Sequence, residues 1–68
     1  MYNADQVREA VKDALKLYGP LKPSALRAIA RDLMVPTDER FEEILIQMLR
    51  DNVVDLKLDT KRISLKHC

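Results

Sequence analysis

Several residue types that support catalysis or metal binding are scarce in this chain of 68 residues. It has one histidine, His67, and one cysteine, Cys68, so one chain cannot assemble a disulfide framework or a Cys/His metal site. Gly19 is the only glycine, which excludes a glycine-rich phosphate loop. No Ser-His-Asp or Cys-His arrangement can be built around a single histidine at this position. We therefore expect no enzyme activity, no cofactor and no metal.

Aromatic residues and long apolar runs are also scarce. Two tyrosines and one phenylalanine are too few for a stacking platform that binds single-stranded nucleic acid. No apolar run approaches the roughly 20 residues that a membrane span requires, and the first residues lack the basic and apolar regions of a signal peptide. We therefore expect a cytoplasmic protein without membrane contact.

The overall composition is that of a folded domain with a nearly balanced charge. Hydrophobic residues make up 47% and charged residues 34% of the chain, which favours one folded domain over residues 1–68. Twelve Lys and Arg residues against 11 Asp and Glu residues give a net charge of +1. Because this balance attracts no particular partner, any binding surface must be a local patch.

Apolar residues at spacings of three and four predict two helices in the first half of the chain. Asn3 is a good N-cap for a helix over residues 4 to about 18, which Gly19 ends. Pro23 favours the first turn of a second helix, and the segment 34–36 interrupts its periodicity. The residues expected to face the core are Ala4, Val7, Val11, Ala14, Leu15 and Tyr18, then Leu26, Ile29, Ala30 and Leu33.

A third helix and two strands are predicted in the second half. Residues 37–51 begin with a threonine N-cap and acidic residues that suit a helix N-terminus, and Asn52 is suited to the left-handed conformation after the helix. The apolar period then changes to two, which predicts strands at 54–58 and 62–66 joined by a hairpin at 59–61. The expected core-facing residues are Phe41, Ile44, Leu45, Met48 and Leu49, then Val54, Leu56, Leu58, Ile63 and Leu65.

This order of elements resembles the winged helix-turn-helix superfamily over essentially the whole chain. The resemblance implies an α+β fold, a small winged helix in which three helices precede a two-stranded β-hairpin wing. It also implies a short first strand near Leu21, a recognition helix over residues 37–51 and a wing around residues 59–62. The residues that carry it are Leu26, Ile29, Ala30, Leu33, Val35, Phe41, Leu45, Met48, Leu49 and Val54. Since this fold serves DNA, RNA and protein binding, the exposed side chains must decide the function.

The first hypothesis is a small DNA-binding regulator of transcription that contacts duplex DNA through the second helix and the wing. Basic side chains in these elements would contact phosphates or a groove, and Gln47 is the best candidate for reading a base. The predicted DNA contacts are Arg27, Arg31, Gln47, Arg50, Lys57, Lys61 and Arg62.

The alternative hypothesis is a winged helix that binds a protein, similar to the compact regulators of phages and plasmids. Residues 36–52 carry two positive and five negative charges, a local net charge of −3. Carboxylates at the leading end of a recognition helix would oppose the attraction of a phosphate backbone, but they would attract a basic partner. The predicted contacts are Asp38, Glu39, Glu42, Glu43 and Ile46. Ordinary solvated charge remains an alternative for both sets of residues.

The first helix is a candidate for self-association. Ala10, Ala14 and Leu17 extend its apolar face beyond what one small core needs, which suggests a homodimer seam between two copies. A wide buried face within one chain is the alternative interpretation.

Overall fold

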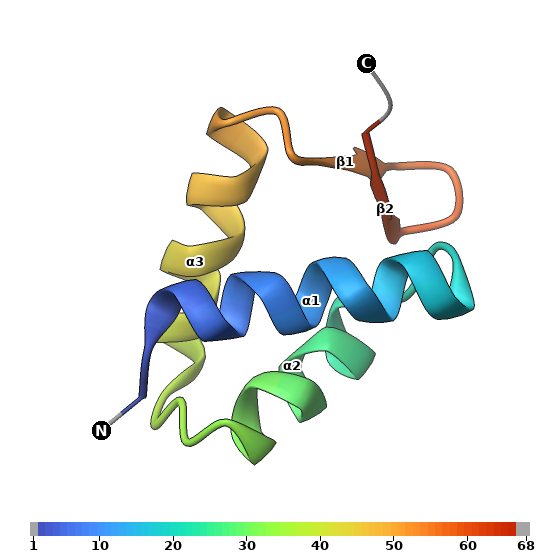
Figure 1. The fold of residues 1–68 in the computed structure, drawn as a ribbon. Helices are drawn as coiled ribbons and strands as arrows, with labels where there is room; N and C mark the ends of the chain where they lie inside the picture. The colour runs from blue at the N-terminus through green and yellow to red at the C-terminus, as the bar shows by residue number, and fades with distance from the viewer. Residues whose placement is uncertain (1, 67–68) are drawn as a thin grey trace.

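In the computed structural model, which describes residues 2–66, the chain folds into three helices followed by a two-stranded antiparallel hairpin (Figure 1). The helices are α1 (Ala4–Tyr18), α2 (Pro23–Asp32) and α3 (Asp38–Arg50), and the strands are β1 (Val54–Lys57) and β2 (Arg62–Leu65). This order confirms the α+β class and the three helices and hairpin predicted from the sequence. The arrangement is compatible with a winged-helix-like fold.

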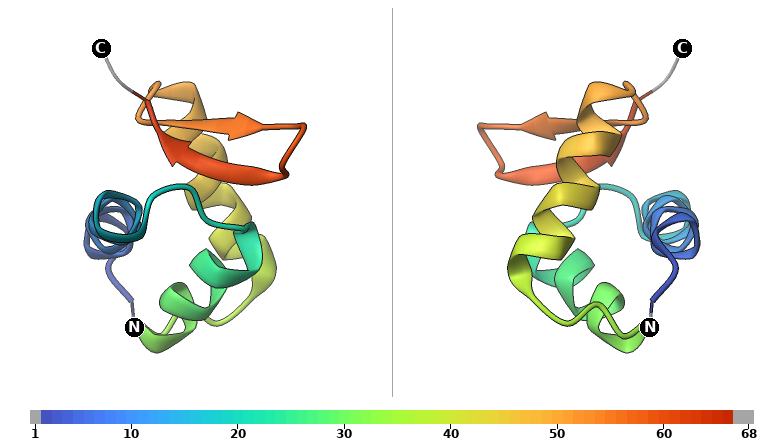
Figure 2. Two further views of the ribbon diagram at one scale, coloured as in Figure 1. Left: turned by 90° about the vertical axis from the view of Figure 1, so that its right-hand side faces the viewer. Right: turned by 90° about the vertical axis from the view of Figure 1, so that its left-hand side faces the viewer.

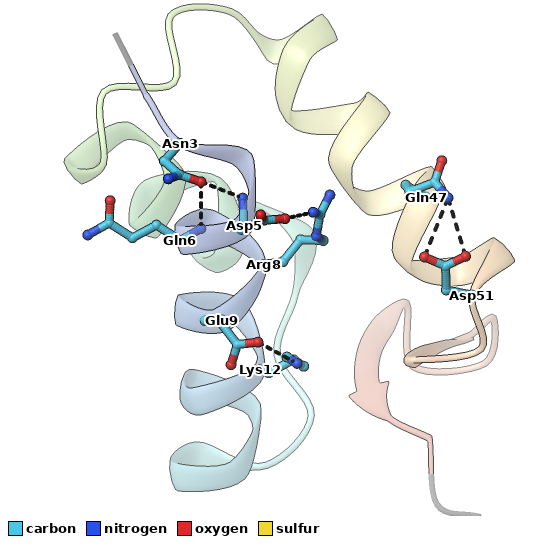
Figure 3. A network of polar contacts seen from close by, with 8 residues as sticks. All are labelled: Asn3, Asp5, Gln6, Arg8, Glu9, Lys12, Gln47 and Asp51. Carbon is cyan, nitrogen blue, oxygen red and sulfur yellow. Dashed lines mark hydrogen bonds and ion pairs between the residues drawn. The ribbon is translucent and has the colours of Figure 1, made fainter.

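The ends of α1 are set by the two local signals that the sequence provides. The Asn3 side-chain oxygen accepts hydrogen bonds from the backbone N–H groups of Asp5, at 2.9 Å, and Gln6, at 3.3 Å (Figure 3). At the other end Gly19 adopts a φ of 80°, and its N–H donates to the Leu15 carbonyl at 3.0 Å. Glycine reaches this left-handed region without the steric cost of a Cβ atom, so the helix ends here as predicted.

The connection between α2 and α3 is a tight turn that contains a left-handed methionine. Pro23 begins α2, and Met34 adopts a φ of 72° shortly after α2 ends. The Thr37 hydroxyl oxygen then accepts a hydrogen bond from the Arg40 N–H at 3.2 Å and caps α3. Asn52 has the left-handed φ of 59° that was predicted for it. Local capping and turn chemistry therefore account for both ends of α3.

The segment between α1 and α2 pairs with the hairpin as a third, very short strand-like segment. The two strands are antiparallel, with Lys57 opposite Arg62 in the register. Leu21 forms an isolated antiparallel bridge with Ile63. The Leu21 N–H donates to the Ile63 carbonyl at 3.0 Å, and the Ile63 N–H donates to the Leu21 carbonyl at 2.7 Å. The short strand expected near Leu21 is therefore present as this bridge, and β2 lies between it and β1.

The core lies where the three helices meet the inner face of the hairpin. No polar or charged side chain among residues 2–66 is buried, so the core itself is entirely apolar. Burying one such side chain stabilises a fold by about 1.5–3 kcal/mol. The largest fully buried side chains are Val7 and Val11 of α1, Leu26 of α2, Met48 of α3 and Val54 of β1.

Three residues expected to face the core are instead exposed. Tyr18 is 70% exposed, because it lies in the last turn of α1, beyond Leu15, the last buried residue of this helix. Leu56 is 40% and Leu58 is 80% exposed. The hairpin extends away from the helices (Figure 2), so only its base is covered. β1 also ends at Lys57 rather than at the predicted residue 58.

Candidate functional site

Arg27, a predicted DNA contact, makes contacts within the protein. Its side chain is only 15% exposed, and its Nε donates to Asp38 Oδ1 at 2.5 Å. Its Nη1 donates to the Val35 carbonyl at 3.5 Å, and its Cζ lies 5.8 Å from the centre of the Phe41 ring. The hydrogen bond and charge of Arg27, with a smaller effect from Arg31, lower the pKa of the Asp38 carboxyl. The Arg27 guanidinium is therefore paired with Asp38 and largely shielded from solvent.

The outward side of α3 presents the acidic residues that the sequence predicted there. Glu39, Glu42 and Glu43 are all exposed, and Ile46 is 49% exposed. Residues four apart on a helix lie on the same side, so Ile46 follows Glu42 along one flank. Glu43 forms an ion pair with Arg40 at 3.4 Å, whereas neither Glu39 nor Glu42 has an ion-pair partner among residues 2–66.

Gln47 and Arg50, the two predicted DNA contacts on α3, are both exposed. The side-chain amide of Gln47 donates to the two carboxylate oxygens of Asp51 at 3.3 and 3.4 Å (Figure 3). Gln47 therefore has a hydrogen-bond partner on its own helix, and a base would have to compete with this carboxylate.

The acidic flank of α3 continues across α2 to the hairpin. One groove is lined by Asp38, Glu42 and Leu45 of α3 together with Pro23, Ser24 and Arg27 of α2. A second groove is lined by Leu56 and Leu58 together with Pro23 and Ser24, and also by Lys22, Thr60 and Lys61. Pro23 and Ser24 belong to both grooves and join them into one surface. The start of α2 and the tip of the hairpin lie on the side of the molecule away from α1 (Figure 2, left). We call this surface the α3–hairpin face. The grooves contribute Pro23, Ser24, Asp38, Glu42, Leu56 and Leu58, and at the hairpin end Lys22 and Lys61. We add Glu39 and Ile46, which lie three residues before and four residues after Glu42 on the same flank of α3.

The cationic residues predicted on the hairpin are divided between its two faces. Lys61, in the loop, lines the groove on the α3–hairpin face. Lys57 and Arg62 are opposite each other in the register, so they share the other face. Lys57 forms an ion pair with Asp55 at 3.2 Å, and Arg62 donates a hydrogen bond to the Pro20 carbonyl at 3.3 Å.

A second candidate surface lies between the end of α1 and this other face of the hairpin. We call it the lysine groove, because Lys16, Lys57 and Lys66 line it with Asp55 as the one acidic residue. Leu15, Gly19, Pro20, Ser64 and Leu65 complete the lining. The sequence does not predict this site, because Lys16 lies about forty or more residues before Lys57 and Lys66 and only the fold brings them together.

Only part of the predicted homodimer seam on α1 is available on the surface, because the core of the chain uses the rest. Ala14 is buried within the chain, so it cannot contribute to a contact between copies. Ala10 is partly buried, and Leu17 is exposed beside Tyr18 in the last turn. The exposed apolar surface of α1 is therefore confined to its C-terminal end.

The described residues, 2–66, contain neither a metal-ligand cluster nor a membrane-spanning helix. No group of three or more His, Cys, Asp or Glu residues in this range could hold a metal ion. No helix in the same range is long and apolar enough to cross a membrane. A hydrogen bond and charge from Lys12 lower the pKa of Glu9, but both residues lie on the surface of α1 (Figure 3). His67 lies outside the described residues, as does Cys68.

Comparisons with known proteins give no match to a family model, to a curated protein or to a solved structure. The function therefore has to be argued from the two surfaces.

Proposed function

We propose that this chain is a winged-helix interaction domain that binds a basic protein partner through the α3–hairpin face. The single observation that carries the proposal is the chemistry of this face. In the winged-helix arrangement the outward side of the third helix, with the start of the second helix and the hairpin, would face DNA. Here that surface combines the carboxylates Glu39 and Glu42, which have no ion-pair partner among residues 2–66, with the exposed aliphatic side chains of Ile46, Leu56 and Leu58. Lys22 and Lys61 lie at its hairpin end.

The electrostatics of the α3 part of the face, away from Lys22 and Lys61, favour a cationic partner. Phosphate neutralisation by Lys and Arg supplies most non-specific affinity for DNA. The nearest arginine of α2, Arg27, already neutralises Asp38, which leaves Glu39 and Glu42 to repel a phosphate backbone. The same two carboxylates attract lysine or arginine side chains, and this attraction steers a basic partner to the face.

The apolar residues of the face favour a protein over a nucleic acid. Ile46 is 49% and Leu58 is 80% exposed, although each would gain about 1.5–3 kcal/mol from full burial. An apolar centre with charged residues around it is the usual composition of a protein interface. The fitting partner is therefore an amphipathic segment that has lysines or arginines beside large apolar side chains.

Duplex DNA binding is the second candidate, supported by the exposed cations. Lys57 and Arg62 lie side by side on the hairpin, and Arg31, Arg50 and Lys61 are also exposed. These side chains would contact phosphates in the manner predicted from the sequence, whereas Arg27 would first have to leave Asp38.

One pair of titrations separates the two candidates. A labelled basic amphipathic peptide with alternating Lys- and Leu-rich faces and a labelled mixed-sequence duplex are each added to the protein at low and near-physiological salt. Fluorescence anisotropy measures binding, and backbone NMR shifts locate the contact. We expect the peptide to bind and to shift Glu42, Ile46 and Leu58, and we expect no measurable duplex binding.

Matched variants test whether the α3–hairpin face is responsible. Glu39→Lys combined with Glu42→Lys should abolish peptide binding. The control combines Asp13→Lys with Asp32→Lys, which changes the net charge equally at exposed positions outside the face, and it should bind the peptide nearly as the parent does. Duplex binding that falls steeply with salt and disappears in a Lys57→Glu, Arg62→Glu variant would instead establish the second candidate.

A further inference from the structure

The two ends of the α3–hairpin face carry opposite charges. At the hairpin end, Lys22 and Lys61 line the groove, and no acidic residue among residues 2–66 joins them there. At the α3 end, the carboxylates Asp38 and Glu42 line the groove, and Arg27 is the one cation among its described lining residues. The ion pair between Arg27 and Asp38 leaves Glu42 as the net charge of this end. The face is therefore positive at the hairpin and negative at α3.

The two lysines of the hairpin end are available to a ligand. Both are exposed, and neither forms an ion pair within residues 2–66. Asp59, the acidic residue of the hairpin loop, does not line this groove, and its carboxylate accepts a hydrogen bond from the Thr60 N–H at 2.9 Å. Lys22 is also the N-cap residue of α2, whose first turn contains no acidic residue, so the helix dipole adds to the positive potential. This end of the face therefore attracts a carboxylate.

Apolar side chains line both grooves beside the charged residues. Leu56 and Leu58 line the groove at the hairpin end, and Phe41 and Leu45 line the groove at the α3 end. Pro23 belongs to both. A ligand that follows the two grooves has to cross Pro23, and it gains affinity from apolar side chains that cover this stretch.

We infer that the partner is a bipolar peptide segment, with basic residues at one end, apolar residues in its middle and acidic residues at the other end. It lies along the two joined grooves in one direction, with its basic end beside Glu42 and its acidic end beside Lys22 and Lys61. The inference rests on the proposed function and adds the charge order of the partner and the direction in which it binds. A segment that is basic throughout meets like charge at the hairpin, which lowers its affinity.

This charge order distinguishes the face from the lysine groove and a peptide from a nucleic acid. In the lysine groove the one acidic residue, Asp55, is paired with Lys57, so that groove has no anionic end. A nucleic acid carries phosphates along its whole length, so it would bring negative charge against Glu42 at the α3 end. A bipolar peptide places an opposite charge at each end of the face.

Three peptides of equal length with the same leucine-rich middle test the inference. The bipolar peptide carries lysines at one end and glutamates at the other, the second peptide carries lysines at both ends, and the third carries glutamates at both ends. Fluorescence anisotropy at low salt should show the bipolar peptide binding on the order of tenfold more tightly than the all-lysine peptide, and the all-glutamate peptide binding most weakly. Equal or tighter binding of either single-sign peptide overturns the inference.

Charge reversal at the hairpin end should reverse the preference. Lys22→Glu combined with Lys61→Glu should bind the all-lysine peptide more tightly than the bipolar peptide. The control combines Lys16→Glu with Lys66→Glu, which changes the net charge equally at exposed positions of the lysine groove, and it should keep the preference of the parent. The Lys22 side chain makes no capping hydrogen bond to α2, and circular dichroism melting verifies that both variants are folded. An unchanged preference in the Lys22, Lys61 variant contradicts the assignment of the acidic end.

A nitroxide label on the peptide locates each end on the unaltered protein. A label at the acidic end of the bipolar peptide should broaden the backbone NMR signals of Thr60 and Lys61. A label at the basic end should broaden those of Glu42 and Ile46. The opposite pattern, or broadening confined to the lysine groove, overturns the inference.

The outcomes separate this inference from the proposed function. An all-lysine peptide that shifts Glu42 and Ile46 and binds as tightly as the bipolar peptide overturns the bipolar partner and leaves the proposed function standing. Absence of binding by all three peptides overturns both.

Discussion

The Arg27 guanidinium of α2 lies against the Asp38 carboxylate in the first turn of α3, with 2.5 Å between Nε and Oδ1. The same side chain reaches the Val35 carbonyl in the turn and lies over the Phe41 ring. A single arginine therefore connects both helices and the turn between them. It fixes how α3 is presented beside α2, and it leaves the rest of the α3 carboxylates without this counter-charge.

Replacing Arg27 should destabilise the fold as well as change the surface. Arg27→Met keeps an apolar stem over Phe41 but removes the contacts to Asp38 and Val35. We expect its urea midpoint to fall below that of the parent. Arg31→Met is the matched control, because Arg31 is exposed and has no ion pair among residues 2–66, and its midpoint should stay close to the parent value. Equal midpoints for both variants would contradict a structural role for Arg27.

The Arg27–Asp38 pair should give a defined pH dependence. The hydrogen bond and charge of Arg27 place the pKa of Asp38 below its ordinary value of 3.8 in the folded state. The resulting stabilisation is complete above the unfolded-state pKa and is lost as the pH falls through the folded-state pKa. NMR titration of the Asp38 carboxyl should show this lowered pKa, and Arg27→Met should raise it. Lys12→Met should raise the pKa of Glu9 and leave that of Asp38 unchanged.

Met34→Gly should stabilise the protein. Met34 holds a φ of 72°, where a Cβ atom is sterically unfavourable, and its exposed side chain has little burial to lose. We expect a gain of about 0.5–1 kcal/mol in the free energy of unfolding. Ala28→Gly is the control, since it lies on the exposed side of α2 and should cost about 1 kcal/mol. A loss of stability in both variants would show that the Met34 side chain packs more than its exposure indicates.

Core and surface leucines should respond very differently to truncation. Leu26 is fully buried, so Leu26→Ala should cost about 2–5 kcal/mol, a large part of the stability of so small a domain. Leu58→Ala, in the exposed hairpin, should change the free energy of unfolding of the monomer by less than about 0.5 kcal/mol. Chemical denaturation at low protein concentration measures both. A large loss for Leu58→Ala would mean that Leu58 itself packs against the helices.

The boundaries of the elements could be predicted because their causes are local. Asn3, Gly19, Thr37 and Asn52 act on backbone groups within a few residues, and each occupies the cap or turn position expected of it. The change of period after Asn52 likewise predicted the hairpin. The exposure of Leu58 could not be predicted, because strand alternation shows which residues share a face but not how far the helices cover that face.

The candidate sites divide in the same way between sequence and structure. The sequence by itself determined that α3 is acidic and that its carboxylates lie on the outward side, since helix periodicity decides this. Only the tertiary structure decided that Arg27 faces Asp38, that Leu56 and Leu58 share a groove with the start of α2, and that Lys16 lines one groove with Lys57 and Lys66. These relationships depend on packing between segments distant in the chain, and a one-dimensional pattern contains no information on which distant side chains become neighbours.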